Sequence, residues 1–138
     1  MRINVRMENA KFYTVFNAKT TICVLPETEH LLHTLLDINI NNVPMSVYEA
    51  TTLQPQYFGQ AIFSRYSPLD KFVPDIGRRI AFCRAKWKLV RAMNHHWFMA
   101  RAAMQKWLSQ KESILFPTIN KMYDNIEYRK DKILNEAN

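Results

Sequence analysis

The stretch that decides the fold is GRRIAFCRAKWKLVRAMNHHWFMARAAMQKWLSQK, residues 77–111. It holds nine Lys or Arg, no Asp or Glu, and all three tryptophans of the chain. After its first residue it has neither glycine nor proline and is rich in good helix formers. With Pro74 and Asp75 as a helix start, it predicts one long helix from about Pro74 to Gln110.

This helix is expected to have a basic face beside an apolar one, because positions three, four and seven apart share a helix face. The basic stripe consists of Arg84, Lys88, Arg91 and His95. The adjoining apolar stripe consists of Ile80, Cys83, Trp87, Val90 and Trp97, widened by Phe82, Leu89, Met93 and Met104. Tryptophans at helical spacing usually fill a core, so we expect these to hold the helix against the rest of the protein.

The segment before this helix predicts a small antiparallel sheet with one short helix. Alternation and β-branched or aromatic content predict strands at residues 2–7, 11–16, 20–25, 43–50 and 57–66. Asn17–Lys19 would close a hairpin between the second and third of these strands. Pro26 and two acidic residues suit the first turn of a Leu-rich helix at about Glu27–Asp37. Gly59 would mark a bulge or a close approach of two backbones.

Pro117 predicts the end of the helical stretch and a separate last helix at about Thr118–Asn135. The expected fold is therefore α+β: a small antiparallel sheet with a short helix, packed on the long basic helix and a C-terminal helix. A chain of 138 residues fits one domain, 1–138, with a β-rich part at 1–73 and a helical part at 74–138.

The positive charge of the chain is concentrated in the stretch quoted above. The whole chain carries +7, whereas residues 77–111 carry nine basic and no acidic side chains, hence +9. Like charges four apart destabilise an isolated helix, so acidic groups elsewhere or a polyanionic partner should compensate. Nucleic acid and an acidic surface of a host protein both remain open as partners. A membrane surface is the least favoured partner, because the apolar face that it needs is expected inside the core.

Several classes of chemistry lack their sequence signals. Two glycines, well apart, exclude phosphate-binding and dinucleotide-binding loops. His30 with His33, and His95 with His96, match no zinc-site spacing, and no nucleophile motif is present. We therefore expect no enzyme, no metal and no cofactor. No signal peptide and no transmembrane run appear, so Cys23 and Cys83 are expected as buried free thiols in the cytoplasm, with a disulfide as the alternative.

A spaced set of small and turn-forming residues resembles a pattern of accessory proteins of tailed bacteriophages. The resemblance covers about a third of the chain and has two parts. The first is FNAKTTICVL, residues 16–25, and the second carries Gly59, Ala61, Pro68, Asp70 and Phe72, followed by Gly77, Ala81 and Ala85. The predicted strand at Val43–Ala50, the Leu-rich helix and the last helix are additions to that pattern. The resemblance implies a phage-encoded protein that acts in the cytoplasm of its host, often by binding a host machine.

The favoured function is a non-catalytic binding protein that engages a host nucleoprotein through the basic helix, such as a host-defence inhibitor of the anti-CRISPR type. The expected contact residues are Arg78, Arg79, Arg84, Lys86, Lys88, Arg91, His95, Arg101 and Lys106. One alternative is a small regulator that binds free DNA or RNA. A second is a phage structural or assembly protein whose long helix packs into an oligomer. A third is an enzyme that uses the His and Cys residues with a bound metal.

Overall fold

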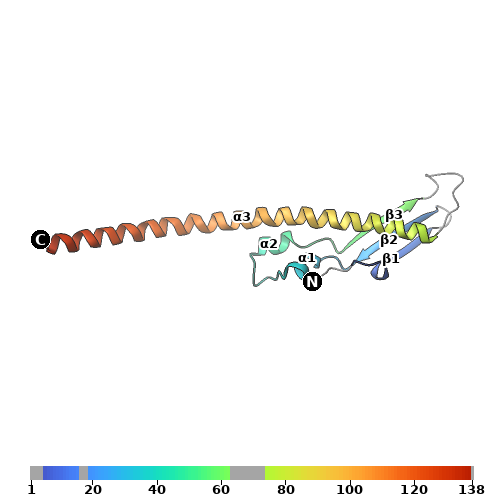
Figure 1. The fold of residues 1–138 in the computed structure, drawn as a ribbon, viewed down its shortest axis with the longest axis horizontal. Helices are drawn as coiled ribbons and strands as arrows, with labels where there is room; N and C mark the ends of the chain where they lie inside the picture. The colour runs from blue at the N-terminus through green and yellow to red at the C-terminus, as the bar shows by residue number, and fades with distance from the viewer. Residues whose placement is uncertain (1–4, 16–18, 63–73, 138) are drawn as a thin grey trace.

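The computed structural model describes residues 5–15, 19–62 and 74–137. They form a small α+β head from which one long helix projects (Figure 1). The elements in chain order are η1 (Met7–Asn9), β1 (Lys11–Val15), β2 (Thr20–Pro26), α1 (Leu31–Leu36), α2 (Met45–Ala50), β3 (Gln56–Ile62) and α3 (Pro74–Ala137). The α+β class and the packing of a small sheet on a long helix are confirmed.

The three strands form one antiparallel sheet in the order β1-β2-β3. Cys23 in the central strand pairs with Phe12 on one side and with Gly59 on the other. Side chains of β2 alternate between half-buried and buried, as expected for a strand with one covered face. The predicted hairpin is confirmed, although residues 16–18 of its loop lie outside the described residues, as do residues 63–66 of the last predicted strand.

The strand predicted at residues 2–7 is wrong where the structure describes it. Residues 1–4 lie outside the described part, and Met7 begins the short 3-10 helix η1. The alternation of apolar and basic residues there is short, and such runs distinguish strand from other structures poorly.

The Leu-rich helix begins at Leu31, four residues later than predicted. Glu27 has φ 56°, a left-handed conformation that cannot start a helix. Thr28 is instead tied to the segment before β3, because its hydroxyl donates to the Gln54 carbonyl at 2.6 Å. The two acidic residues thus precede the helix and do not form its first turn.

The strand predicted at Val43–Ala50 is wrong, because this segment forms α2. Val47 and Ala50 are three residues apart, and in a helix both can face Ala100 of α3, where they form a small second core with it. The carbonyl of Pro44 accepts bonds from the first turn, which closes the start of the helix. The apolar residues Val43, Met45 and Val47 lie two apart. So short a run fits the two-residue period of a strand and also the 3.6-residue period of a helix.

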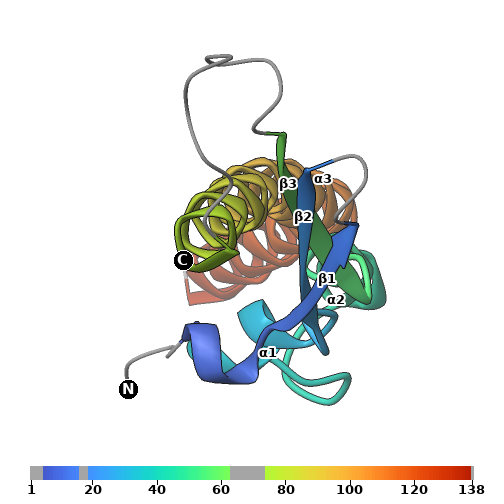
Figure 2. The same cartoon turned by 90° about the vertical axis from the view of Figure 1, so that its right-hand side faces the viewer.

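The main core lies between the sheet and the first turns of α3. Ala81, Ala85 and Leu89 recur every four residues, and each is completely buried. They pack on the inward side chains of β2 and β3, among them Cys23 and Ala61. Figure 2, seen nearly along α3, shows the helix beside β3 on one side of the sheet. Small residues at this contact let the two backbones approach closely, as predicted for Gly59.

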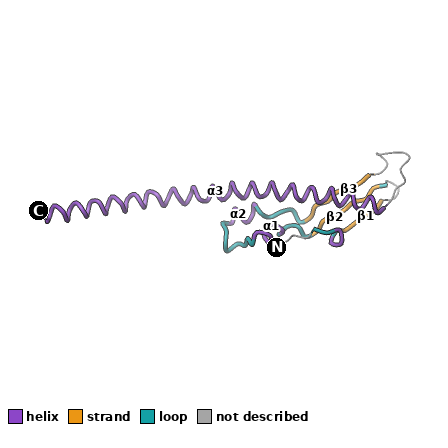
Figure 3. Tube along the Cα trace, viewed as in Figure 1, coloured by secondary structure: helices purple, strands orange, loops and turns teal. Residues whose placement is uncertain are grey.

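The prediction of two helices is wrong, because α3 runs without interruption from Pro74 to Ala137 (Figure 3). Pro117 lies inside it and removes a single intrahelical hydrogen bond without ending the helix. The hydroxyl of Thr118 donates to the Ile114 carbonyl and that of Ser113 to the Gln110 carbonyl, so side chains bond the helix backbone on both sides of the proline. We call residues 108–137, which extend beyond the head, the arm.

Candidate functional site

The predicted basic contact residues all lie on exposed positions of α3. They are Arg78, Arg79, Arg84, Lys86, Lys88, Arg91, His95, Arg101 and Lys106. The structure brings Arg84, Lys88, Arg91 and His95 into one row, as their spacing predicts. Arg101 lies ten residues beyond Arg91, about 15 Å farther along the helix axis. Arg101 and Lys106 therefore belong to a separate part of the surface.

A groove of about 860 Å³ lies where α3 passes the edge of β3. It is lined by Gly59 and Gln60 of β3 and by Ile76, Arg79, Ile80, Cys83, Arg84, Trp87 and Lys88 of α3. Arg84 anchors this edge, because its guanidinium donates to the Gln60 carbonyl at 2.7 Å. Basic groups therefore stand beside a wall that is mostly apolar.

The tryptophans do not fill the core, and this corrects the sequence-based expectation. Trp87 is 61% exposed and Trp97 is 43% exposed, while Trp107 is half-buried. The helix packs on the sheet through the small face of Ala81, Ala85 and Leu89. Trp87 lies two residues from Ala85 and hence points about 200° away from it. Most of the stripe predicted as core is thus solvent-facing, including Ile80, Val90 and Cys83.

Cations of the basic row lie over exposed aromatic rings. The guanidinium of Arg91 stands 5.2 Å from the Trp87 ring centroid, and the ammonium of Lys88 stands 5.4 Å from that of Phe58. Such cation–π contacts partly offset the mutual repulsion of the row. The sequence pattern did not identify Phe58 as part of this surface. Its signal is the alternation of β3, in which Tyr57 and Gly59 are buried and Phe58 faces outward.

One carboxylate of the described residues, that of Asp75, forms an ion pair on this surface. Among ion pairs between described residues, the basic set contributes that of Arg79 with Asp75, at 3.7 Å between two exposed side chains. Exposed pairs of this kind stabilise a fold by at most about 1 kcal/mol. Residues 77–111 carry nine basic and no acidic side chains, so this part of α3 has a strong excess of positive charge.

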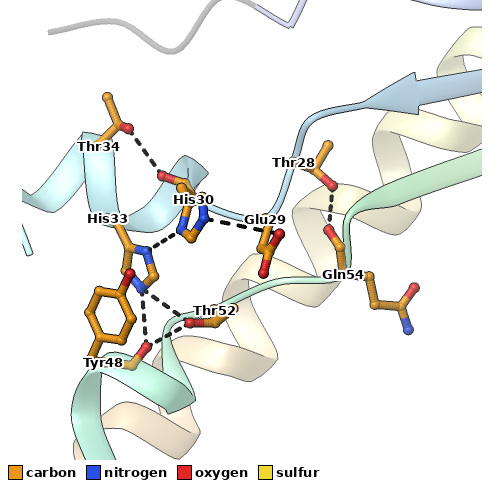
Figure 4. A network of polar contacts seen from close by, with 8 residues as sticks. All are labelled: Thr28, Glu29, His30, His33, Thr34, Tyr48, Thr52 and Gln54. Carbon is orange, nitrogen blue, oxygen red and sulfur yellow. Dashed lines mark hydrogen bonds and ion pairs between the residues drawn. The ribbon is translucent and has the colours of Figure 1, made fainter. Parts of the chain in front are cut away.

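His30, which precedes α1, and His33 within it have a structural role (Figure 4). His33 is buried, stacks on the Tyr48 ring at 4.1 Å, and places Nε2 3.0 Å from the Tyr48 carbonyl. A carbonyl only accepts, so Nε2 of His33 carries a proton, and a second hydrogen bond joins Nδ1 of His33 to Nδ1 of His30 at 2.9 Å. This chain of bonds joins α1 to α2.

The other histidines and the two cysteines lie in different environments. His96 Nδ1 donates to the Ala50 carbonyl at 2.9 Å, whereas His95 is exposed. Cys23 and Cys83 are both free, the first buried and the second exposed in the groove, so burial was predicted wrongly for Cys83. Across the described ranges, no three His, Cys, Asp or Glu side chains gather in a way that could hold a metal ion.

Within the part of the chain that the structure describes, no helix combines the length and apolar character needed to cross a membrane. The chain matches no protein family, no curated protein and no solved structure.

Proposed function

We propose that the protein is a non-catalytic protein that binds single-stranded nucleic acid. The binding surface is the basic row of α3, which consists of Arg84, Lys88, Arg91 and His95. The observation that carries the proposal is the pairing of exposed cations with exposed aromatic rings beside the groove. Lys88 lies over Phe58 and Arg91 lies over Trp87. Nucleic acid offers a matching pair of groups, the phosphate for the cation and the base for the ring.

The cations are spaced to follow a backbone. Arg84, Lys88 and Arg91 cover about 10 Å of the helix axis, enough to contact more than one phosphate of an extended strand. Each contact releases counterions, so affinity should fall steeply with salt.

The aromatic groups favour unpaired bases over a duplex. Trp87 and Phe58 are each more than half exposed, at 61% and 55%. Stacking on such a ring contributes about 1–3 kcal/mol per base and tolerates any base identity. In a duplex the base faces are already stacked and are closed to such contacts.

The same surface fits nucleic acid that is held by a protein machine. Guide or template strands in a host nucleoprotein present phosphates and unpaired bases, so engagement of such a complex, including inhibition of host defence, is part of the proposal. Free oligonucleotide is its simplest test.

The experiment is fluorescence anisotropy with labelled single- and double-stranded DNA and RNA over about a tenfold range of salt. The test variant is Lys88→Gln with Arg91→Gln, and the matched control is Lys121→Gln with Lys132→Gln on the arm. For single strands, we expect the slope of log affinity against log salt to become shallower by roughly 1.4 in the test variant and to stay unchanged in the control.

The aromatic contribution has its own variant. Trp87→Ala should weaken single-strand binding about tenfold or more and leave the weaker duplex binding nearly unchanged. Equal loss in the test and control charge variants would contradict a specific site on α3. Binding to anionic vesicles without binding to any nucleic acid would show that the exposed apolar and basic surface serves a membrane instead.

A further inference from the structure

The arm carries a bare apolar face that the head does not cover. The six residues that make this face are Leu108, Leu115, Ile119, Met122, Ile126 and Ile133. Their spacings of seven, four, three, four and seven keep them within about 40° of one line along the helix. Ile119 is partly buried, and the other five are 46% to 65% exposed.

This part of the helix has little intrinsic stability. Pro117 lies within it, and Ile114, Thr118 and Ile119 are β-branched residues, which lower helix propensity. Helices in proteins are stabilised mainly by packing of an apolar face. From Leu108 onward no described residue is buried, so the described part of the chain supplies no packing partner for the arm.

We infer that the arm pairs with the arm of a second copy, antiparallel, as a two-helix coiled coil. The apolar row follows the a and d positions of a heptad, with Ile119 and Ile126 at a and Met122 at d. In an antiparallel pair centred between Asn120 and Lys121, each a residue meets a d residue. Leu108 then faces Ile133 of the second copy, Leu115 faces Ile126, and Ile119 faces Met122.

Two charged residues occupy further positions of the same row, and they favour one relative direction of the two helices. Glu112 lies seven residues before Ile119, and Arg129 lies seven residues after Met122. In the antiparallel register Glu112 faces Arg129 of the second copy, and the pair occurs twice. A parallel, in-register pair would place Glu112 against Glu112 and Arg129 against Arg129 in the seam, which disfavours that arrangement.

The flanks of the seam are consistent with this register. Phe116 approaches Tyr123 of the second copy on one side, and both rings are exposed in the single chain, at 53% and 65%. On the other side Lys111 approaches Lys132, where long side chains can turn into solvent and salt screens their repulsion. The pairing uses residues 108–133 and leaves the part of α3 that α2 covers, up to Met104, outside the seam.

Charge distinguishes a second copy from the other occupants of an apolar face. The arm holds five basic and five acidic side chains, so it carries no net charge. A polyanion or an anionic lipid surface would find no net attraction here, unlike on the head. The inference does not depend on the proposed function, because it concerns different residues and a different partner.

The first experiment measures the mass of the whole protein by analytical ultracentrifugation at about 1 to 100 µM, without nucleic acid. The expected species is a dimer. Glu112→Arg and Arg129→Glu, each alone, should raise the dissociation constant about tenfold or more, because two like charges then meet in the seam. The double variant restores opposite pairs and should return the constant to near that of the unmodified protein. Asp124→Arg, on the far side of the helix, is the matched control and should have little effect.

The second experiment tests direction by disulfide cross-linking in a Cys83→Ser background. An equimolar mixture of Leu115→Cys and Ile126→Cys proteins should cross-link, and neither should cross-link with itself. Thermal unfolding of the head, followed by circular dichroism, establishes that each variant folds. Three results would each overturn the inference. They are a folded monomer at all concentrations, self-cross-linking of Leu115→Cys, and a double variant that dimerises as weakly as the single variants.

Discussion

The Cα of Gly59 lies so close to α3 that a Cβ at this position would stand 2.3 Å from the backbone nitrogen of Ala85 and 2.6 Å from the Ala81 carbonyl oxygen. Both atoms belong to the helix backbone, which cannot move aside as a flexible side chain can. The contact between β3 and α3, and with it the position of the basic row at the sheet edge, depends on the absence of a side chain here.

Gly59→Ala should therefore destabilise the protein by about 3 kcal/mol or more, since a methyl group would force the sheet and the helix apart. Chemical denaturation measures the change in the free energy of unfolding. The adjacent Gln60→Ala is the matched control. Gln60 is exposed, and the hydrogen bond from Arg84 goes to its backbone carbonyl, which the substitution keeps. Equal stability of the two variants would show that the contact is looser than described.

Thr21 and Thr51 form a matched pair for the cost of a buried hydroxyl. Both are completely buried, but Thr51 donates to the Val47 carbonyl at 2.9 Å, whereas the Thr21 hydroxyl has no hydrogen-bond partner among the described residues. Thr21→Val should raise the free energy of unfolding by about 1 kcal/mol, and Thr51→Val should lower it by a similar amount. Changes of the same sign in denaturant titrations of the two variants would contradict this assignment.

His33 should stabilise the contact between α1 and α2 through its hydrogen bonds as well as its ring. His33→Phe keeps a ring that can stack on Tyr48 but leaves the Tyr48 carbonyl without this donor, so we expect a loss of about 1–2 kcal/mol. The measurement is thermal or urea unfolding, with His95→Phe as the control at an exposed position. A loss no larger than that of the control would mean that the hydrogen bonds add no net stability.

The two thiols should differ strongly in reactivity. Burial raises the pKa of Cys23 from 9.0 to about 11, so its reactive thiolate is scarce at pH 8, whereas Cys83 is exposed. A thiol reagent should label one cysteine in the folded protein and both in urea, and Cys83→Ser should remove the rapid reaction. Two rapidly reacting thiols in the folded protein would be inconsistent with the burial of Cys23.

The same pKa gives a dependence of stability on pH. Because the folded protein holds the Cys23 proton more tightly than the unfolded chain, this contribution is fully present below about pH 9 and is lost as pH rises toward 11. Cys23→Ala, although less stable overall, should lose less stability over that interval. Parallel losses in the two proteins would assign the effect to other groups.

The hairpin of β1 and β2 could be predicted because its strands carry β-branched and aromatic residues on either side of a short polar loop. The α2 segment could not, since Val43, Met45 and Val47 fit a strand, and only the contact of Val47 and Ala50 with α3 selects the helix. Tertiary packing decides such short runs.

The basic row was predictable from spacing alone, but the role of its neighbours was not. The sequence pattern does not reveal that α3 packs through Ala81 and Ala85 instead of through its larger residues. That choice depends on the small face that Gly59 presents, which is a property of the folded pair of elements. When α3 packs on β3 through Ala81 and Ala85, the side chain of Trp87 faces solvent.

The 64 residues of α3 make the protein much longer than a compact domain. At about 1.5 Å per residue the helix measures roughly 95 Å, whereas a compact domain of this chain's size has a radius of gyration of about 14 Å. The arm accounts for about 45 Å of that span, so whatever binds its tip is held far from whatever binds the head. A rotation of the head by about 10° would sweep the tip through roughly 8 Å, which makes the helix a lever as well as a spacer.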